Sequence, residues 1–254
     1  MSDTAATSRQ LALPFDEPEP FSAEDFIAAP SNAAARAALA APETWVNARL
    51  IVWGAAGCGK SHLASVWAAE HGAATIVAAR LREAWQPPSA ALVIEDIDVM
   101  ASPVALFATL ESAAGRRSPV LMTSRQPPGR LTIPLPDLAS RLRASLAIPI
   151  EVAESALLDG LLLRLAANRQ LVLPTSLHQF LLHRLPRRPG VLREAIARLD
   201  RYALALGTAP SRRIAERLLA ELTDPPEASA PEEPKRGRGD DYIENHESGT
   251  RRLL

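Results

Sequence analysis

Residues 54–61 read GAAGCGKS, and this stretch fits the phosphate-binding pattern G-x-x-x-x-G-K-[ST] at every fixed position. The apolar residues Leu50–Trp53 before it predict a buried strand, and His62–Glu70 after it predict a helix. A glycine-rich turn that spells the motif by chance is the competing explanation. Because strand, loop and helix follow in the order that a phosphate site requires, the stretch favours a nucleotide-binding protein with an α/β fold.

The fixed positions of this loop have expected roles. Gly54, Gly57 and Gly59 let the backbone wrap closely enough for its N–H groups to face phosphates, and the helix N-terminus adds a favourable dipole. We expect Lys60 to contact the β- and γ-phosphates and Ser61 to hold Mg²⁺. The predicted ligand is therefore ATP or ADP, with Mg²⁺.

Composition narrows the class further. A chain of 254 residues has room for one nucleotide-binding domain and a small companion, and its net charge of −1 gives no overall sign of nucleic-acid binding. The single cysteine, Cys58, excludes an intramolecular disulfide; we interpret it as a small filler of the loop in preference to a redox sensor. The polar N-terminus and the lack of a long apolar run predict a cytoplasmic protein without membrane contact.

Changes of pattern divide the chain into four segments. Residues 1–20, rich in proline and acid, predict a disordered arm, and residues 224–254 a disordered tail. Residues 153–223 predict only helices, at 154–169, 175–185, 190–206 and 211–222. Residues 21–152 predict a helix over Asn32–Ala41 and a parallel, helix-covered sheet, with strands at Leu50–Trp53, Thr75–Ala78, Ala91–Ile94, Val120–Thr123 and Leu146–Ile150.

Further residues are candidates for catalysis. The apolar strand Leu92–Ile94 ends in Glu95 and Asp96, and such a strand delivers one carboxylate to Mg²⁺, here Glu95 with Ser61, and a second to the attacking water. A buried strand that merely ends in surface acids is the simpler alternative. The hydroxyls that end Val120–Ser124 are expected near the γ-phosphate.

Two arginines have informative positions. Arg141 lies in a short helix just before the last strand, where it could reach a neighbouring subunit, and Arg193 opens a later helix from which it could lean over its own phosphates. Solvated arginines on helix surfaces are the alternative for both.

These pieces, in this order, resemble the AAA+ ATPases and, among them, the DnaA branch, over roughly residues 10–222. The similar motifs are Phe21–Ile27 with Pro30-Ser31-Asn32, which borders the adenine in that branch; the phosphate loop ending in Gly-Lys-Ser-His-Leu; residues 135–142 with the arginine finger Arg141; and Arg193 as the sensor arginine of the lid. The resemblance implies an α/β AAA+ P-loop NTPase, with a parallel five-stranded sheet and a C-terminal helical lid. It adds Asn32 and His62 to the nucleotide site.

The arm carries a peptide similar to those that dock on the bacterial sliding clamp. Residues Gln10–Phe15 fit the pattern Q-L-x-L-P-[LF], in which Gln10 and Leu11 open the motif and Leu13 and Phe15 are anchors worth roughly 1.5–3 kcal/mol each when buried. Pro14 stiffens the peptide and lowers its ordering cost. A short apolar stretch that folds back on its own domain is the alternative.

A DnaA-like ATPase without the DNA-binding domain expected after the lid, and with a clamp peptide, resembles the Hda-type regulators that inactivate DnaA. The resemblance implies binding to the clamp (the β subunit of DNA polymerase III), contact with DNA only through the clamp, a nucleotide-dependent homo-oligomer, and Arg141 acting on the ATP of DnaA to prevent re-initiation. Two departures bear on this. Glu95 replaces the usual Asp, which implies weak or regulated ATPase activity, and Arg125 stands where an acid is common.

The sequence is also compatible with two other functions. One is a DnaA-like initiator or helicase-loading ATPase that assembles on DNA, and the other is a stand-alone ATPase switch with a different client.

Overall fold

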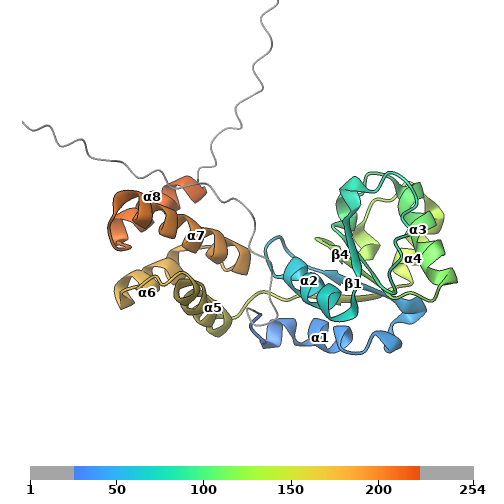
Figure 1. The fold of residues 1–254 in the computed structure, drawn as a ribbon, viewed down its shortest axis with the longest axis horizontal. Coiled ribbons are helices and arrows are strands. Elements are labelled where there is room, and N and C mark those ends of the chain that lie inside the picture. The colour runs from blue at the N-terminus through green and yellow to red at the C-terminus, as the bar shows by residue number, and fades with distance from the viewer. Residues whose placement is uncertain (1–25, 224–254) are drawn as a thin grey trace, which may run out of the picture.

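The computed structural model describes residues 26–223, which form an α/β part followed by a helical part (Figure 1). The expected arm with Gln10–Phe15 and the expected tail over 224–254 lie outside the described residues. The strands of the α/β part are β1 (Arg49–Trp53), β2 (Ala74–Val77), β3 (Leu92–Glu95), β4 (Val120–Ser124) and β5 (Leu146–Pro149). All five expected strands are thus confirmed, with ends shifted by one residue at most.

These strands form one parallel sheet in the order β2-β3-β4-β1-β5. Since the strands are parallel, the loops that follow β1, β3 and β4 all leave from the same edge. The phosphate loop follows β1, which lies between β4 and β5, so this loop starts one strand in from the β5 side of the sheet. The sheet topology therefore brings the end of the Glu95 strand to the edge that carries the phosphate loop.

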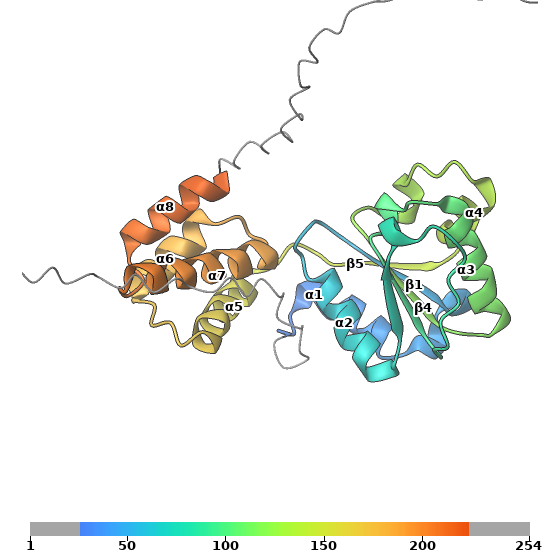
Figure 2. The same cartoon turned by 45° about the horizontal axis from the view of Figure 1, so that its top comes forward.

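Helices cover both faces of the sheet, as Figure 2 shows: α1 (Pro30–Leu39) and α2 (Lys60–His71) on one face, α3 (Pro103–Gly115) and α4 (Pro136–Arg143) on the other. Successive strand residues alternate between two apolar cores. Leu50 and Val52 pack toward α1 and α2, whereas Ile51 packs toward α3 and α4. Strands buried on both faces explain the nearly continuous apolar runs in the sequence.

Some element boundaries differ from the sequence-based expectation. The helix expected over Asn32–Ala41 runs from Pro30 to Leu39, because proline suits the first position of a helix, where its missing N–H is not needed. The α/β part also contains five short 3₁₀ turns: η2 (Pro42–Thr44), η3 (Val46–Ala48), η4 (Ala78–Arg80), η5 (Ile97–Val99) and η6 (Pro128–Arg130).

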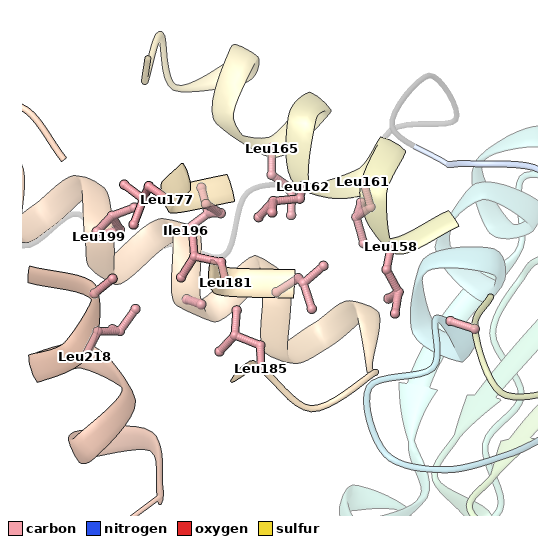
Figure 3. Close-up of a cluster of buried hydrophobic side chains, with 14 of the residues drawn as sticks. Leu158, Leu161, Leu162, Leu165, Leu177, Leu181, Leu185, Ile196, Leu199 and Leu218 are labelled. Carbon is pink, nitrogen blue, oxygen red and sulfur yellow. The ribbon is translucent and has the colours of Figure 1, made fainter. Parts of the chain in front are cut away.

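The helical part, called the lid below, consists of α5 (Ser155–Asn168), α6 (Thr175–Arg184), α7 (Pro189–Leu206) and α8 (Arg212–Thr223). Leucines of all four helices converge in its core (Figure 3), and Leu162 and Leu181 are fully buried there. Ile27 and Ala29, which precede α1, also pack against this core. The lid therefore has its own apolar core and touches the α/β part through the segment before α1.

Candidate nucleotide-binding site

The phosphate loop joins β1 to α2 with a backbone that favours glycine, most clearly at Gly57 and Gly59. Gly57 has a φ of 75° and Gly59 a φ of 109°, in the left-handed region that residues with a Cβ rarely adopt. Gly59 is also the N-cap of α2, so the loop leads directly into a helix N-terminus. Loop and helix together supply the backbone geometry and dipole of an anion site.

Lys60 is buried inside the loop. Its Nζ donates to the carbonyl oxygens of Gly54 at 2.8 Å and Ala55 at 3.0 Å. The Sγ of Cys58 lies 4.0 Å from the same nitrogen, and burial raises the pKa of that thiol. The loop thus holds the positive charge of Lys60 in place.

A cavity of about 220 Å³ lies at this loop, between the α/β part and the lid. The loop and the first turn of α2 form its polar wall with Gly57, Cys58, Gly59, Lys60, Ser61 and His62. The segment around the start of α1 contributes Phe26, Ile27 and Asn32, and the lid contributes Leu157, Leu161, Pro189, Gly190 and Arg193. A lining that combines polar groups of the loop with apolar side chains suits a ligand with a charged end and a flat ring.

Asn32 holds the segment before α1 at the cavity. Its Nδ2 donates to the carbonyl oxygen of Ile27 at 2.9 Å, and its Oδ1 accepts the N–H of Ala29 at 3.1 Å. The Phe26 ring meets the His62 ring edge to face, with centroids 5.1 Å apart. Asn32 therefore fixes the local backbone, while Phe26 and His62 form part of the wall.

Ser31 and Glu154 connect the α/β part to the lid. The N–H and the hydroxyl of Ser31 donate to the two carboxylate oxygens of Glu154, at 2.6 and 2.8 Å. The backbone N–H of Glu154 and then the Ser31 hydroxyl hold the pKa of this carboxyl below its usual range. This connection joins the start of α1 to the start of α5, beside the cavity.

Glu95 ends β3, and Asp96 follows with a φ of 55°. The N–H of Asp96 donates to Oγ1 of the buried Thr123 at 2.9 Å, which joins the ends of β3 and β4. The Ser124 hydroxyl donates to the carbonyl oxygen of Gln126 at 2.7 Å. These groups lie at the same sheet edge as the phosphate loop but do not line the cavity, and both hydroxyls are engaged by the protein's own backbone.

Arg125, which departs from the DnaA-like pattern, has a local partner. Its N–H donates to Oδ1 of Asp98 at 3.0 Å, and its Nε lies 3.8 Å from Oδ2 of the same carboxylate. The side chain is 56% exposed, so this pair contributes little to stability.

The two candidate arginines lie in different places. Arg193 lines the cavity from α7, with its Nη2 3.5 Å from Nδ1 of His62. Arg141 lies in the last turn of α4, just before β5, and borders a hollow of about 770 Å³ at the opposite edge of the sheet. The five residues of β1 span roughly 16 Å between these edges, so Arg141 does not reach the phosphate loop of its own chain.

Sequence reasoning missed Leu157, Leu161 and Gly190 as cavity residues. The two leucines belong to the apolar stripe of α5, and residues four apart share a helix face, so part of the stripe serves the cavity as well as the lid core. Gly190 stands three residues before Arg193, in a motif from which the sequence predicts only the arginine as a site residue.

Among residues 26–223, no three side chains of His, Cys, Asp or Glu come together as a metal site. Mg²⁺ usually takes one or two carboxylates together with phosphates and water, so the pair Ser61 and Glu95 stays a prediction. No helix in the same range has the length and apolar character to cross a membrane.

The chain shares its fold with solved ATPase domains. Domain III of the replication initiation protein DnaA from Thermotoga maritima aligns with a TM-score of 0.70 and 19% identity, over 82% of this chain and 99% of that one. AMPPCP-bound DnaA from Aquifex aeolicus gives 0.62 and 16%, over 81% and 72%. The RuvB Holliday junction branch migration motor of Thermotoga maritima gives 0.59 and 17%, over 80% and 72%. Neither a protein-family model nor a curated protein matches the chain.

A five-stranded parallel sheet with helices on both faces, a phosphate loop after β1 and a C-terminal helical part make up the AAA+ fold, as in DnaA domain III and RuvB. The predicted fold class is thereby confirmed. Identities below 20% show the fold and leave the activity to be argued from the site.

Proposed function

We propose that the protein binds an adenine nucleotide, ADP or ATP, in the cavity at the phosphate loop. The observation that carries this proposal is the convergence of the glycine loop, Lys60 and Arg193 on one cavity with an apolar wall. Phosphates between the two cations and a base against Phe26 and Leu157 would match the chemistry of each wall. A DnaA with the same fold has been solved with AMPPCP bound.

We propose that Mg²⁺ would be held by Ser61, which lines the cavity, and by Glu95, which ends β3 at the same sheet edge but outside the cavity lining. When bound, the ion would neutralise phosphate charge. Asp96 would be the second carboxylate for hydrolysis. Because Mg²⁺ demands near-ideal octahedral geometry and Glu is longer than Asp, we propose that intrinsic ATPase activity is weak or regulated.

The nucleotide would also order the molecule. The cavity is lined by both the α/β part and the lid, so a ligand in it bridges them. A ligand present at 100 times its Kd stabilises the state that binds it by about 2.7 kcal/mol. Nucleotide therefore favours the arrangement in which the lid is docked on the loop.

At the finer level, we propose an Hda-type regulator of replication initiation in the cytoplasm that stimulates ATP hydrolysis by DnaA. The position of Arg141 supports this. Its side chain is 37% exposed and lies at the sheet edge opposite the phosphate loop of its own chain, so it could contact a nucleotide only if another molecule holds that nucleotide. An arginine supplied in this way is worth roughly 10³–10⁵ in rate. The clamp is proposed as a second partner, and DNA through the clamp, from the sequence of Gln10–Phe15 alone.

A DnaA-like, DNA-associated initiator or helicase-loading ATPase is supported equally well by the fold. A replication initiator DnaA solved with AMPPCP and single-stranded DNA aligns with a TM-score of 0.59 and 16% identity. The initiator and the regulator differ in their need for a clamp. An initiator-like protein binds single-stranded DNA without the clamp, whereas the regulator acts on DnaA only when clamp and DNA are present. The third candidate, a stand-alone switch, would turn over ATP without either partner.

The test combines ATP-loaded DnaA, clamp, DNA and this protein, and measures the ATP lost from DnaA. The regulator is expected to speed this loss, and Leu13→Ala with Phe15→Ala is expected to abolish both capture by the clamp and the stimulation. Val172→Ala, which truncates an 81% exposed apolar side chain of the lid, is the control. Clamp capture that survives the double change contradicts the clamp assignment, and binding to single-stranded DNA without the clamp favours the initiator.

A further inference from the structure

The lid touches the phosphate loop through two glycines that lie backbone to backbone. The N–H of Gly190 donates to the carbonyl oxygen of Gly57 at 2.8 Å. A Cβ at Gly190 would stand 2.9 Å from the Cα of Gly57 and 3.3 Å from its carbonyl oxygen. Because these atoms belong to the backbone, no side-chain rotation relieves the overlap. Glycine at position 190 therefore permits the approach of the lid.

Hydrogen bonding in the first turn of α7 explains why this contact forms. Pro189 has no N–H, so Gly190 supplies the first donor of the helix. The N–H groups of Val191 and Leu192 donate to the carbonyl oxygen of Arg188, at 3.0 and 3.3 Å. The first N–H groups of a helix have no acceptor of the usual kind within it. For Gly190 the phosphate loop provides that acceptor, and so it caps the lid helix.

The contact also controls the position of Arg193. Residues three apart on a helix lie on the same face, so Gly190 and Arg193 both face the cavity, as its lining shows. The short contact at Gly190 fixes how far this face stands from the loop. The reach of the Arg193 guanidinium toward the loop follows from that separation.

We propose that Gly190 is a positioning residue for nucleotide binding. Its contact with Gly57 forms a clasp that holds the lid on the phosphate loop and sets Arg193 at the phosphates. This inference rests on the proposed binding of nucleotide in the cavity. Any larger residue at 190 pushes α7 away from the loop and moves Arg193 with it.

The test is Gly190→Ala in the full chain, with Gly115→Ala as the matched control, since a Cβ at Gly115 meets nothing within 4 Å. Alanine is a better helix former than glycine, so α7 itself is not weakened, and thermal melting by circular dichroism checks that the variant is folded. The first readout is the Kd for a fluorescent ADP. The second is the rate at which a maleimide labels Cys58, the single cysteine, which lines the cavity beside Gly57.

Gly190→Ala is expected to bind ADP about three- to tenfold more weakly, in line with the loss of one hydrogen bond, and to label severalfold faster at Cys58. Gly115→Ala should match the natural chain in both. Because the clasp acts through Arg193, adding Gly190→Ala to Arg193→Ala should weaken binding by less than about twofold further.

If Gly190→Ala binds ADP with the Kd of the wild-type protein and is labelled at Cys58 at the wild-type rate, the proposed role of the Gly57–Gly190 contact is wrong. If the increases in Kd caused by Gly190→Ala and by Arg193→Ala multiply in the double variant, Gly190 does not act through Arg193. If the natural chain binds no ADP, the proposed nucleotide site fails, and the labelling rate of Cys58 still decides whether Gly190 holds the lid on the loop.

Discussion

Arg141 and Glu111 form an ion pair at the sheet edge opposite the phosphate loop, with Nη2 2.8 Å from Oε2. The Arg141 guanidinium also lies over the Phe107 ring, 4.9 Å from its centre. The other carboxylate oxygen of Glu111 is 3.7 Å from the buried Arg49. These contacts hold Arg141 in a defined orientation at the surface.

Glu111→Ala should lower stability and weaken the hold on Arg141. Burial lowers the pKa of Arg49, with the nearby charge of Arg141 adding to the effect, so removing the shared carboxylate leaves two close cations unbalanced. Since Glu111 is 42% exposed, we expect a loss of about 1 kcal/mol in urea unfolding. Glu216→Ala, which breaks an exposed pair with Arg212, should change stability by less than about 0.5 kcal/mol. Equal effects of the two changes would argue against a special role for Glu111.

Lys60→Ala should weaken nucleotide binding strongly. A hydrogen bond to a charged group contributes about 1.5–3 kcal/mol, which corresponds to roughly a 10- to 150-fold rise in Kd. Isothermal titration with ADP and with ATP measures this, and Arg164→Ala, an exposed cation of the lid, is the control. An unchanged Kd in Lys60→Ala would place the nucleotide elsewhere.

The lid core supplies a matched pair of variants. Leu162 is fully buried among the lid leucines (Figure 3), whereas its neighbour Leu163 is 53% exposed. Leu162→Ala should destabilise the protein by about 2–5 kcal/mol and weaken nucleotide binding, because the lid forms one wall of the cavity. Leu163→Ala should change neither by much. If Leu162→Ala and Leu163→Ala have similar melting temperatures, the packing described for the lid is wrong.

Because the carboxylate of Glu154 accepts hydrogen bonds from Ser31, the stability of the protein should depend on pH. The pKa of Glu154 is lowered in the folded protein, so its stabilising contribution is present above the unfolded value of about 4.3 and is lost as pH falls through the folded value. Ser31→Ala should raise the folded pKa of Glu154 and flatten the decline of stability as pH falls below the unfolded value of about 4.3. Urea unfolding across this range, with the exposed Ser176→Ala as control, measures it. If stability falls with pH in the same way in Ser31→Ala as in the unchanged protein, the Ser31 hydroxyl does not lower the pKa of Glu154.

Much of the fold could be predicted because it depends on local patterns. Apolar runs marked every strand, and the glycine motif placed the phosphate loop between β1 and α2. The start of α1 at Pro30 was missed because apolar periodicity does not register the preference of proline for the first helical position.

The contacts that complete the site could not be predicted in this way. Gly57 and Gly190 are far apart in the sequence, and their approach depends on how the lid packs on the α/β part. The pairing of Arg141 with Glu111 likewise requires α3 and α4 to lie side by side on one face of the sheet. Neither relationship leaves a periodic or compositional trace, so only the three-dimensional structure reveals them.

The loss of ATP from DnaA in the presence of clamp and DNA tests the central proposal most directly when two arginine variants are compared. Arg141 and Arg143 both stand in the last turn of α4, but Arg143 is exposed and does not line the hollow that Arg141 borders. The natural chain and Arg143→Ala should speed the loss of ATP, whereas Arg141→Ala should leave it at the unstimulated rate. Stimulation that survives in Arg141→Ala, or none with the natural chain, would contradict a regulator that acts on DnaA through Arg141.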